Sequence, residues 1–86
     1  MEIETEDQNK QFISLDNLLE ILGNPTRRII LSKLAKVPHS ASELSKILGI
    51  SRQAIHSQLD ILSSHNVVER IGDEKRGGKY RIKSNL

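Results

Sequence analysis

The sequence predicts a mainly α-helical fold that ends in a small β-hairpin, and three observations carry this prediction. Four segments between residues 14 and 64 have apolar residues at helical spacing and begin at a residue that caps helices well. Only a short turn with a glycine separates the last two segments, as in a helix-turn-helix unit. Two short alternating segments, 67–71 and 79–83, then flank a glycine-rich turn.

Size and composition limit what this fold can do. A chain of 86 residues has room for one small core. It has no cysteine, which excludes disulfides, thiolate metal sites and a cysteine nucleophile. Phe12 and Tyr80 are its only aromatic residues, too few for a platform that stacks single-stranded nucleic acid. The chain has no bilayer-length apolar run and its acidic start is unlike a secretory signal, so we expect a cytoplasmic protein.

The N-terminal part is expected to be a flexible tail followed by the first helix. Residues 1–11 are polar and predict the tail, whereas 12–86 predict one folded domain. Ser14 can cap the first helix, and Gly23 can end it in the left-handed conformation. A start at Thr5 also fits a capping box, but it lacks the hydrophobic staple that Ser14 has, so we prefer Ser14. Four leucines share one face of this helix: Leu15, Leu18, Leu19 and Leu22.

The second helix is expected over residues 25–36. Asn24 is a good N-cap, and Pro25 suits the first helical position because its missing N–H costs nothing there. A proline shortly after the helix ends it, since the residue before a proline avoids helical geometry. An apolar stripe faces inward, and we expect the basic residues Arg27 and Arg28 to lie mostly on the outer face.

The next two helices form the helix-turn-helix unit. Ser40 and Glu43 fit a capping box at the start of the third helix, and Ser42 is an alternative cap. Gly49 is suited to end that helix. Ser51 can then cap the fourth helix after a turn of only a few residues.

The fourth helix is expected over residues 51–64, and the residue types on its polar face indicate DNA binding. Its apolar residues recur at helical spacing and are expected to be buried, which leaves the polar ones exposed together. Arginine can make two hydrogen bonds to guanine in the major groove, and glutamine two to adenine. The alternative is a plain amphipathic helix with a solvated face, and the helix alone does not decide. The expected base-reading residues are Arg52, Gln53, His56 and Ser57.

The hairpin favours DNA binding over a merely solvated helix. Residues 72–79 predict a basic wing, and residues 70–83 carry six Lys or Arg against two Asp or Glu. Tyr80 and Ile82 alternate with cations, so one face of the last strand packs and the other is expected to be uniformly basic. Such cations can lie along phosphates or enter the minor groove. The expected backbone contacts are Ser51, Arg27, Arg28, Lys75, Arg76, Lys79 and Arg81.

The segments LGNPTRRIIL, ASELSKILGISRQAIHSQLDIL and KYRI together resemble the winged helix-turn-helix domain of ArsR-type transcriptional regulators, especially archaeal members. The resemblance covers about residues 14–86. It implies a homodimer that binds a pseudo-palindromic operator in double-stranded DNA, with the fourth helix in the major groove. The first helix carries the expected dimer interface, because the helix-turn-helix unit that would read the DNA (the reading unit) does not need its leucines. These are Leu15, Leu18, Leu19 and Leu22.

Two departures limit the resemblance. Metal-sensing members place cysteines at the start of the third helix, where this chain has Ser40 and Ser42, so a thiolate metal effector is not expected. Family members also have a C-terminal helix after the wing, with another metal site and much of the dimer interface, but this chain stops at Leu86. Either the first helix alone makes the dimer contact, or the chain is a fragment or degenerate form of a longer regulator.

No cofactor, metal or catalytic site is predicted. His39, His56 and His65 are 17 and 9 residues apart, unlike the four-residue spacing of two ligands on one helix. We therefore predict a sequence-specific DNA-binding transcriptional regulator, associated with the nucleoid in the cytoplasm, rather than an enzyme or a membrane protein. Two alternatives remain open, a winged-helix protein-interaction module and a non-specific architectural DNA-binding protein, because a fold does not fix a function.

Overall fold

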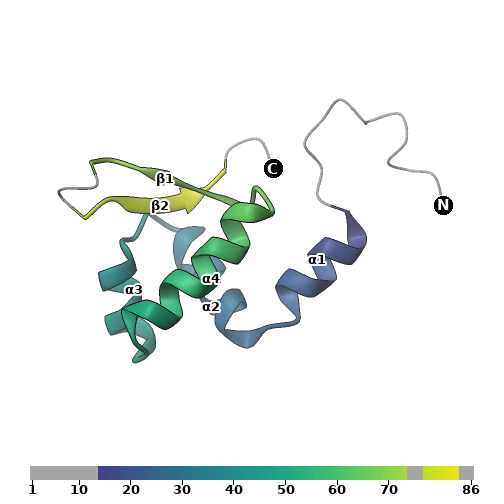
Figure 1. Cartoon of the computed structure of the whole chain (residues 1–86), viewed down its shortest axis with the longest axis horizontal. Helices are drawn as coiled ribbons and strands as arrows, with labels where there is room; N and C mark the ends of the chain where they lie inside the picture. Colours follow the sequence, from purple (N-terminus) through teal and green to yellow (C-terminus); the bar gives the residue numbers. More distant parts are fainter. Residues whose placement is uncertain (1–13, 74–76, 84–86) are drawn as a thin grey trace.

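The computed structural model describes residues 14–73 and 77–83. Four helices precede a two-stranded antiparallel sheet, which is the predicted winged helix-turn-helix architecture (Figure 1). The predicted tail over residues 1–11 lies outside the described residues. The elements are α1 (Leu15–Leu22), α2 (Pro25–Leu34), α3 (Ala41–Leu48), α4 (Arg52–Ser64), β1 (Val68–Ile71) and β2 (Lys79–Ile82).

Each helix begins at the cap that the sequence predicts. At α3 the capping box is complete, because the Glu43 N–H donates to Ser40 Oγ at 3.0 Å and the Ser40 N–H donates to Glu43 Oε1 at 2.8 Å. Ser42 is therefore not the cap. Such bonds satisfy N–H groups that have no partner within the helix. The N-caps are Ser14, Asn24, Ser40 and Ser51.

The helix ends agree less well with the prediction. Gly49 has φ 73°, the left-handed end expected for α3. Gly23 has φ −73°, so the left-handed end predicted for α1 is wrong, and this glycine instead continues the helical conformation. α2 ends at Leu34, before the predicted residue 36, because the chain tightens there. The Lys36 N–H bonds to the Lys33 carbonyl at 3.1 Å, as in a 3₁₀ turn.

One aliphatic core joins the elements. Ile55, Leu59 and Leu62 of α4 are completely buried, which confirms the inward stripe of this helix. Tyr80 of β2, 8% exposed, brings the wing into the same core. Burying each large aliphatic side chain stabilises the fold by about 1.5–3 kcal/mol. The buried cluster consists of Ile21, Ile30, Leu34, Ala41, Leu44, Ile55, Leu59, Leu62, Val67, Val68 and Tyr80.

The sheet is attached to the helix-turn-helix unit by one additional bridge. β1 and β2 pair antiparallel, with Glu69 opposite Arg81. His39, in the loop between α2 and α3, exchanges backbone bonds with Tyr80: its N–H donates to the Tyr80 carbonyl at 3.1 Å and its carbonyl accepts from the Tyr80 N–H at 2.7 Å. The bridge holds the wing beside the start of α3, while α1 lies at the other end of the long axis (Figure 1).

Candidate nucleic-acid interface

The start of α4 exposes a polar face and buries the opposite, apolar face. Ile55 and Leu59 are completely buried, and the residues between them on the opposite side face solvent. The 3.6-residue period of a helix produces this division. The Ser51 hydroxyl accepts from the Ala54 N–H at 3.0 Å and so fixes where the helix begins. All four predicted base-reading residues are exposed: Arg52, Gln53, His56 and Ser57.

Arg52 lies at the junction of the two helices of the reading unit. Its Nη1 donates to Ser42 Oγ of α3 at 3.3 Å. A guanidinium has five N–H donors in a planar fork, so one such bond orients the group and leaves donors for another partner. Ser42, proposed from the sequence as an alternative cap, therefore contacts a predicted base-reading side chain instead.

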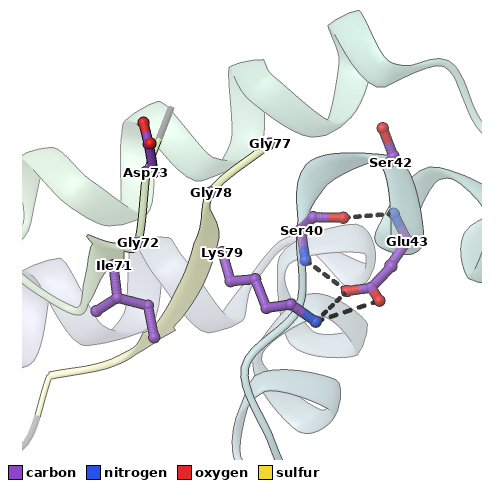
Figure 2. A pocket seen from close by; sticks show the side chains of 9 residues that line it. All are labelled: Ser40, Ser42, Glu43, Ile71, Gly72, Asp73, Gly77, Gly78 and Lys79. Carbon is purple, nitrogen blue, oxygen red and sulfur yellow. Dashed lines mark hydrogen bonds and ion pairs between the residues drawn. The ribbon is translucent and has the colours of Figure 1, made fainter. Parts of the chain in front are cut away.

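The outward residues of β2, Lys79 and Arg81, are basic and exposed as predicted, but acidic side chains of α3 and β1 pair with both of them. Lys79 Nζ lies 3.3 Å from both carboxylate oxygens of Glu43 on α3 (Figure 2). Arg81 Nε donates to Glu69 Oε2 at 2.8 Å, across the β1–β2 register. Two carboxylates thus neutralise two cations that the sequence pattern leaves unpaired. Both pairs are partly exposed, and exposed ion pairs are worth only about 0–1 kcal/mol, so a phosphate can compete for these cations.

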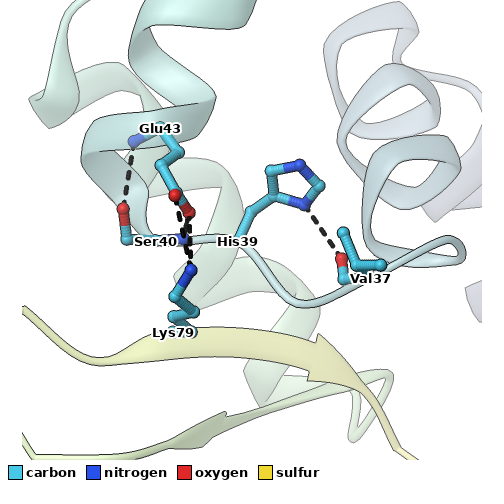
Figure 3. Close-up of polar contacts among 5 residues, drawn as sticks. All are labelled: Val37, His39, Ser40, Glu43 and Lys79. Carbon is cyan, nitrogen blue, oxygen red and sulfur yellow. Dashed lines mark hydrogen bonds and ion pairs between the residues drawn. The ribbon is translucent and has the colours of Figure 1, made fainter.

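Glu43 joins the helix cap to the wing (Figure 3). Its carboxylate accepts from the Ser40 N–H and from Lys79 Nζ. The Ser40 bond first, and the Lys79 bond second, lower the pKa of Glu43 below its ordinary value of 4.5. Glu43 therefore stays ionised at neutral pH, and its carboxylate is the anion bound at the N-terminus of α3. In the loop before α3, Nδ1 of the His39 ring lies 2.9 Å from the Val37 carbonyl oxygen.

A groove of about 520 Å³ lies between the start of α3 and the wing (Figure 2). Gly72 and Gly77 have φ values of 87° and 80°, a left-handed conformation that favours glycine at these turn positions. Lys75 and Arg76 lie outside the described residues. The lining residues are Ser40, Ser42, Glu43, Ile71, Gly72, Asp73, Gly77, Gly78 and Lys79.

Arg27 does not lie on the outer face of α2, which corrects the prediction that it contacts phosphates. It is 9% exposed, and its guanidinium donates to the carbonyls of Glu20 and Ile21 and to Gln58 Oε1. The sequence did contain a signal for this placement, because position 27 lies on the same helical face as Ile30 and Leu34, which are both buried. Arg28 is exposed, and its Nη1 donates to the Leu22 carbonyl.

Among the described residues, the four leucines of α1 are exposed to solvent. The sole buried side chain of α1 is Ile21, which is 1% exposed. Leu15 is 69% and Leu19 is 61% exposed, and Leu18 and Leu22 are also exposed. Large exposed apolar patches on small domains are typical of protein–protein interfaces. The four residues predicted to form the dimer interface are therefore accessible to a partner.

Two kinds of site have no basis in the residues that the structure describes. Within 14–73 and 77–83, no three His, Asp or Glu side chains gather where they could hold a metal ion. Across these same ranges, none of the helices combines the length and the apolar character needed to cross a bilayer.

Comparison with known proteins supports the fold and the family. Residues 22–71 match the family described as "Helix-turn-helix domain". A biofilm growth-associated repressor from Xylella fastidiosa is 31% identical over 64 residues, which cover 74% of this chain and 56% of the repressor. The chain thus spans little more than half the length of this curated relative.

Two solved structures have the same fold. The ArsR-like transcriptional regulator from Rhodococcus sp. RHA1 is 35% identical with a TM-score of 0.72, and the match covers 80% of this chain and 62% of that chain. The transcriptional repressor BigR from Xylella fastidiosa is 29% identical with a TM-score of 0.75, over 92% of this chain and 80% of that chain. These proteins are regulators by name, in agreement with the predicted family and with the prediction that the chain is no enzyme. None of them is archaeal, so that part of the resemblance has no support.

Proposed function

Since this chain belongs to the helix-turn-helix domain family and has the winged fold of ArsR-type regulators, we propose that it is a transcriptional regulator that binds a specific operator in double-stranded DNA. The observation that carries this proposal is the exposed polar face of α4, which begins at the Ser51 cap and lies opposite a completely buried apolar stripe. At a chromosomal operator the protein would be associated with the nucleoid.

In the proposed complex, α4 enters the major groove and the wing lies against the backbone. Arg52 and Gln53, at the start of the helix, are suited to bidentate bonds with guanine and adenine. His56 and Ser57, one turn further on, read neighbouring base edges. Phosphates replace Glu43 and Glu69 as partners of the wing cations, because these ion pairs are weak and solvent-exposed. The backbone contacts are Ser51, Arg28, Lys75, Arg76, Lys79 and Arg81.

We further propose that the protein acts as a homodimer through α1. Its four exposed leucines are the apolar surface that this pairing would bury. A two-fold pair would place its α4 helices about 34 Å apart, one turn of DNA, and would read two half-sites in opposite orientation.

Selection of binding sites from random duplex DNA tests the proposal. The expected result is a pseudo-palindromic site with two half-sites at one preferred separation. If the full chain binds no duplex DNA even at low salt, the surface belongs to a protein-interaction module instead. If it binds every duplex equally at physiological salt, the protein is a non-specific architectural one.

A further inference from the structure

The end of α1 is held by side chains of the next helix. The last carbonyls of a helix have no partner within it. In α1, the Leu19 carbonyl accepts from the Gly23 N–H at 2.9 Å. The next three, those of Glu20, Ile21 and Leu22, accept from two consecutive arginines of α2. α1 has no basic residue in its own last turn, so these arginines also supply the positive charge that favours a helix C-terminus.

Arg27 makes two of these bonds and a third one elsewhere. Its Nε donates to the Ile21 carbonyl at 3.2 Å and its Nη2 to the Glu20 carbonyl at 2.9 Å. Its Nη1 donates to Gln58 Oε1 of α4, also at 2.9 Å. One rigid, planar and nearly buried guanidinium therefore contacts both α1 and α4.

This contact matters because α1 has little other attachment to the core. Ile21 is the one buried side chain of α1, and the helix packs on α2, which in turn packs on α4. Gln58 is the neighbour of Ser57 and is partly buried, on the side of α4 that faces α2. The orientation of α1 relative to α4 thus depends on a small number of contacts, and Arg27 is the polar one that reaches both helices.

We propose that Arg27 is a positioning residue that fixes the direction of α1 relative to α4 and thereby sets the separation of the half-sites that the dimer reads. The second part rests on the proposed function, in which α1 carries the dimer contact and α4 the base contacts. A change in the angle between these helices displaces the partner's α4 along the DNA. Successive base pairs are 3.4 Å apart and rotated by roughly a tenth of a turn, so a small displacement changes the preferred operator.

Variants of Gln58 test the proposal more cleanly than variants of Arg27, whose loss leaves three acceptors without a donor and can unfold the chain. Gln58→Met removes the acceptor on α4 and keeps the side-chain length and the bonds to α1. Gln58→Glu keeps an acceptor for Arg27 and is the matched control. Thermal unfolding of each variant shows that it is folded before it is used.

The first measurement is the distance between α1 and α4 in solution. Because the chain has no cysteine, spin labels can be placed at two exposed positions, Glu20→Cys and Asp60→Cys. The labelled protein is then diluted with unlabelled protein, so that the measured distance is the one within a protomer. Pulsed electron–electron resonance is expected to give one narrow distribution for the parent protein and for Gln58→Glu. For Gln58→Met the distribution should shift or broaden by about 1–2 Å, the size of typical helix shifts. An unchanged distribution in Gln58→Met would overturn the positioning role.

The second measurement is affinity for selected operators whose half-sites are moved one base pair closer together or further apart. The parent protein and Gln58→Glu should prefer the selected separation, and in Gln58→Met this preference should fall by about threefold to tenfold, the effect of losing one hydrogen bond. An equal loss at every separation would contradict a role in spacing. A parent protein that prefers no separation would contradict the dimeric regulator instead, and the spin-label distances would still decide whether Arg27 positions α1.

Discussion

Glu43 shows how one side chain can serve both a local and a distant structure. It completes the capping box of α3 with the Ser40 N–H three residues away, and it binds Lys79 of the wing 36 positions along the chain. Its lowered pKa reflects both bonds, with the bond to Ser40 as the larger cause. Protonation of this carboxylate weakens the helix start and the wing contact together.

The sign of this shift gives a pH prediction. The pKa of Glu43 is lower in the folded state than its ordinary value of 4.5, so the stabilisation is fully present above pH 4.5 and is lost as pH falls through the lowered pKa. Glu43→Gln keeps a capping-box side chain but does not titrate. Thermal unfolding between pH 7 and pH 3 should therefore show a steeper acid loss in the parent protein than in Glu43→Gln. Identical acid profiles would mean that the carboxylate contributes nothing to stability.

A second residue-scale prediction concerns Arg52 and Gln53. If they read bases, replacing either with alanine should weaken binding to the selected operator by about 1–3 kcal/mol and change binding to random duplex little. Fluorescence anisotropy with both duplexes measures the two affinities for one protein sample, so the random duplex is the internal control. Ser42→Ala removes only the internal partner of Arg52, and it should cost less than Arg52→Ala. Equal losses on both duplexes would assign these side chains to the backbone.

At the scale of elements, local chemistry made the helices predictable. A cap and the stripe that follows it lie within a few residues of each other, so Ser51 and the buried face of α4 could be read from the sequence. Contacts between elements could not be predicted from the sequence in this way. Arg27 and Gln58 are 31 positions apart, and no local pattern shows that a helix end will lie beside them. The prediction that Gly23 ends α1 in the left-handed conformation failed because the chain continues through that residue in helical geometry.

The wing provides a prediction about salt. Each phosphate that a cation neutralises on duplex DNA changes the slope of log affinity against log salt concentration by about 0.9. Lys79→Ala combined with Arg81→Ala should therefore reduce the steepness of that slope by about 2 and weaken operator and random duplex alike. Glu69→Gln, which releases Arg81 from its ion pair, is the control and should leave the slope no less steep. An unchanged slope in the double variant would mean that these cations remain with their carboxylates on DNA.

At the scale of the whole molecule, the distribution of apolar surface argues for a partner. The core uses one residue of α1, yet this helix carries four leucines that stay 37–69% exposed in the described protomer. Exposure of these side chains costs free energy that pairing would recover. The sequence suggested the interface because the reading unit did not need these leucines, but only the structure shows that the rest of the described chain leaves them exposed.

The dimer can be tested without disturbing the fold of the protomer. Leu15 and Leu19 are 69% and 61% exposed, so Leu15→Ser with Leu19→Ser should leave thermal stability at low protein concentration almost unchanged. Sedimentation should show a dimer for the parent chain and a monomer for the variant, and the variant should lose affinity for the full operator while still binding an isolated half-site weakly. Val37→Ser removes another exposed apolar side chain, 56% exposed and outside α1, and should remain dimeric. A parent chain that sediments as a monomer at tens of micromolar would show that two protomers do not assemble through α1. The half-site spacing would then have to arise on the DNA itself.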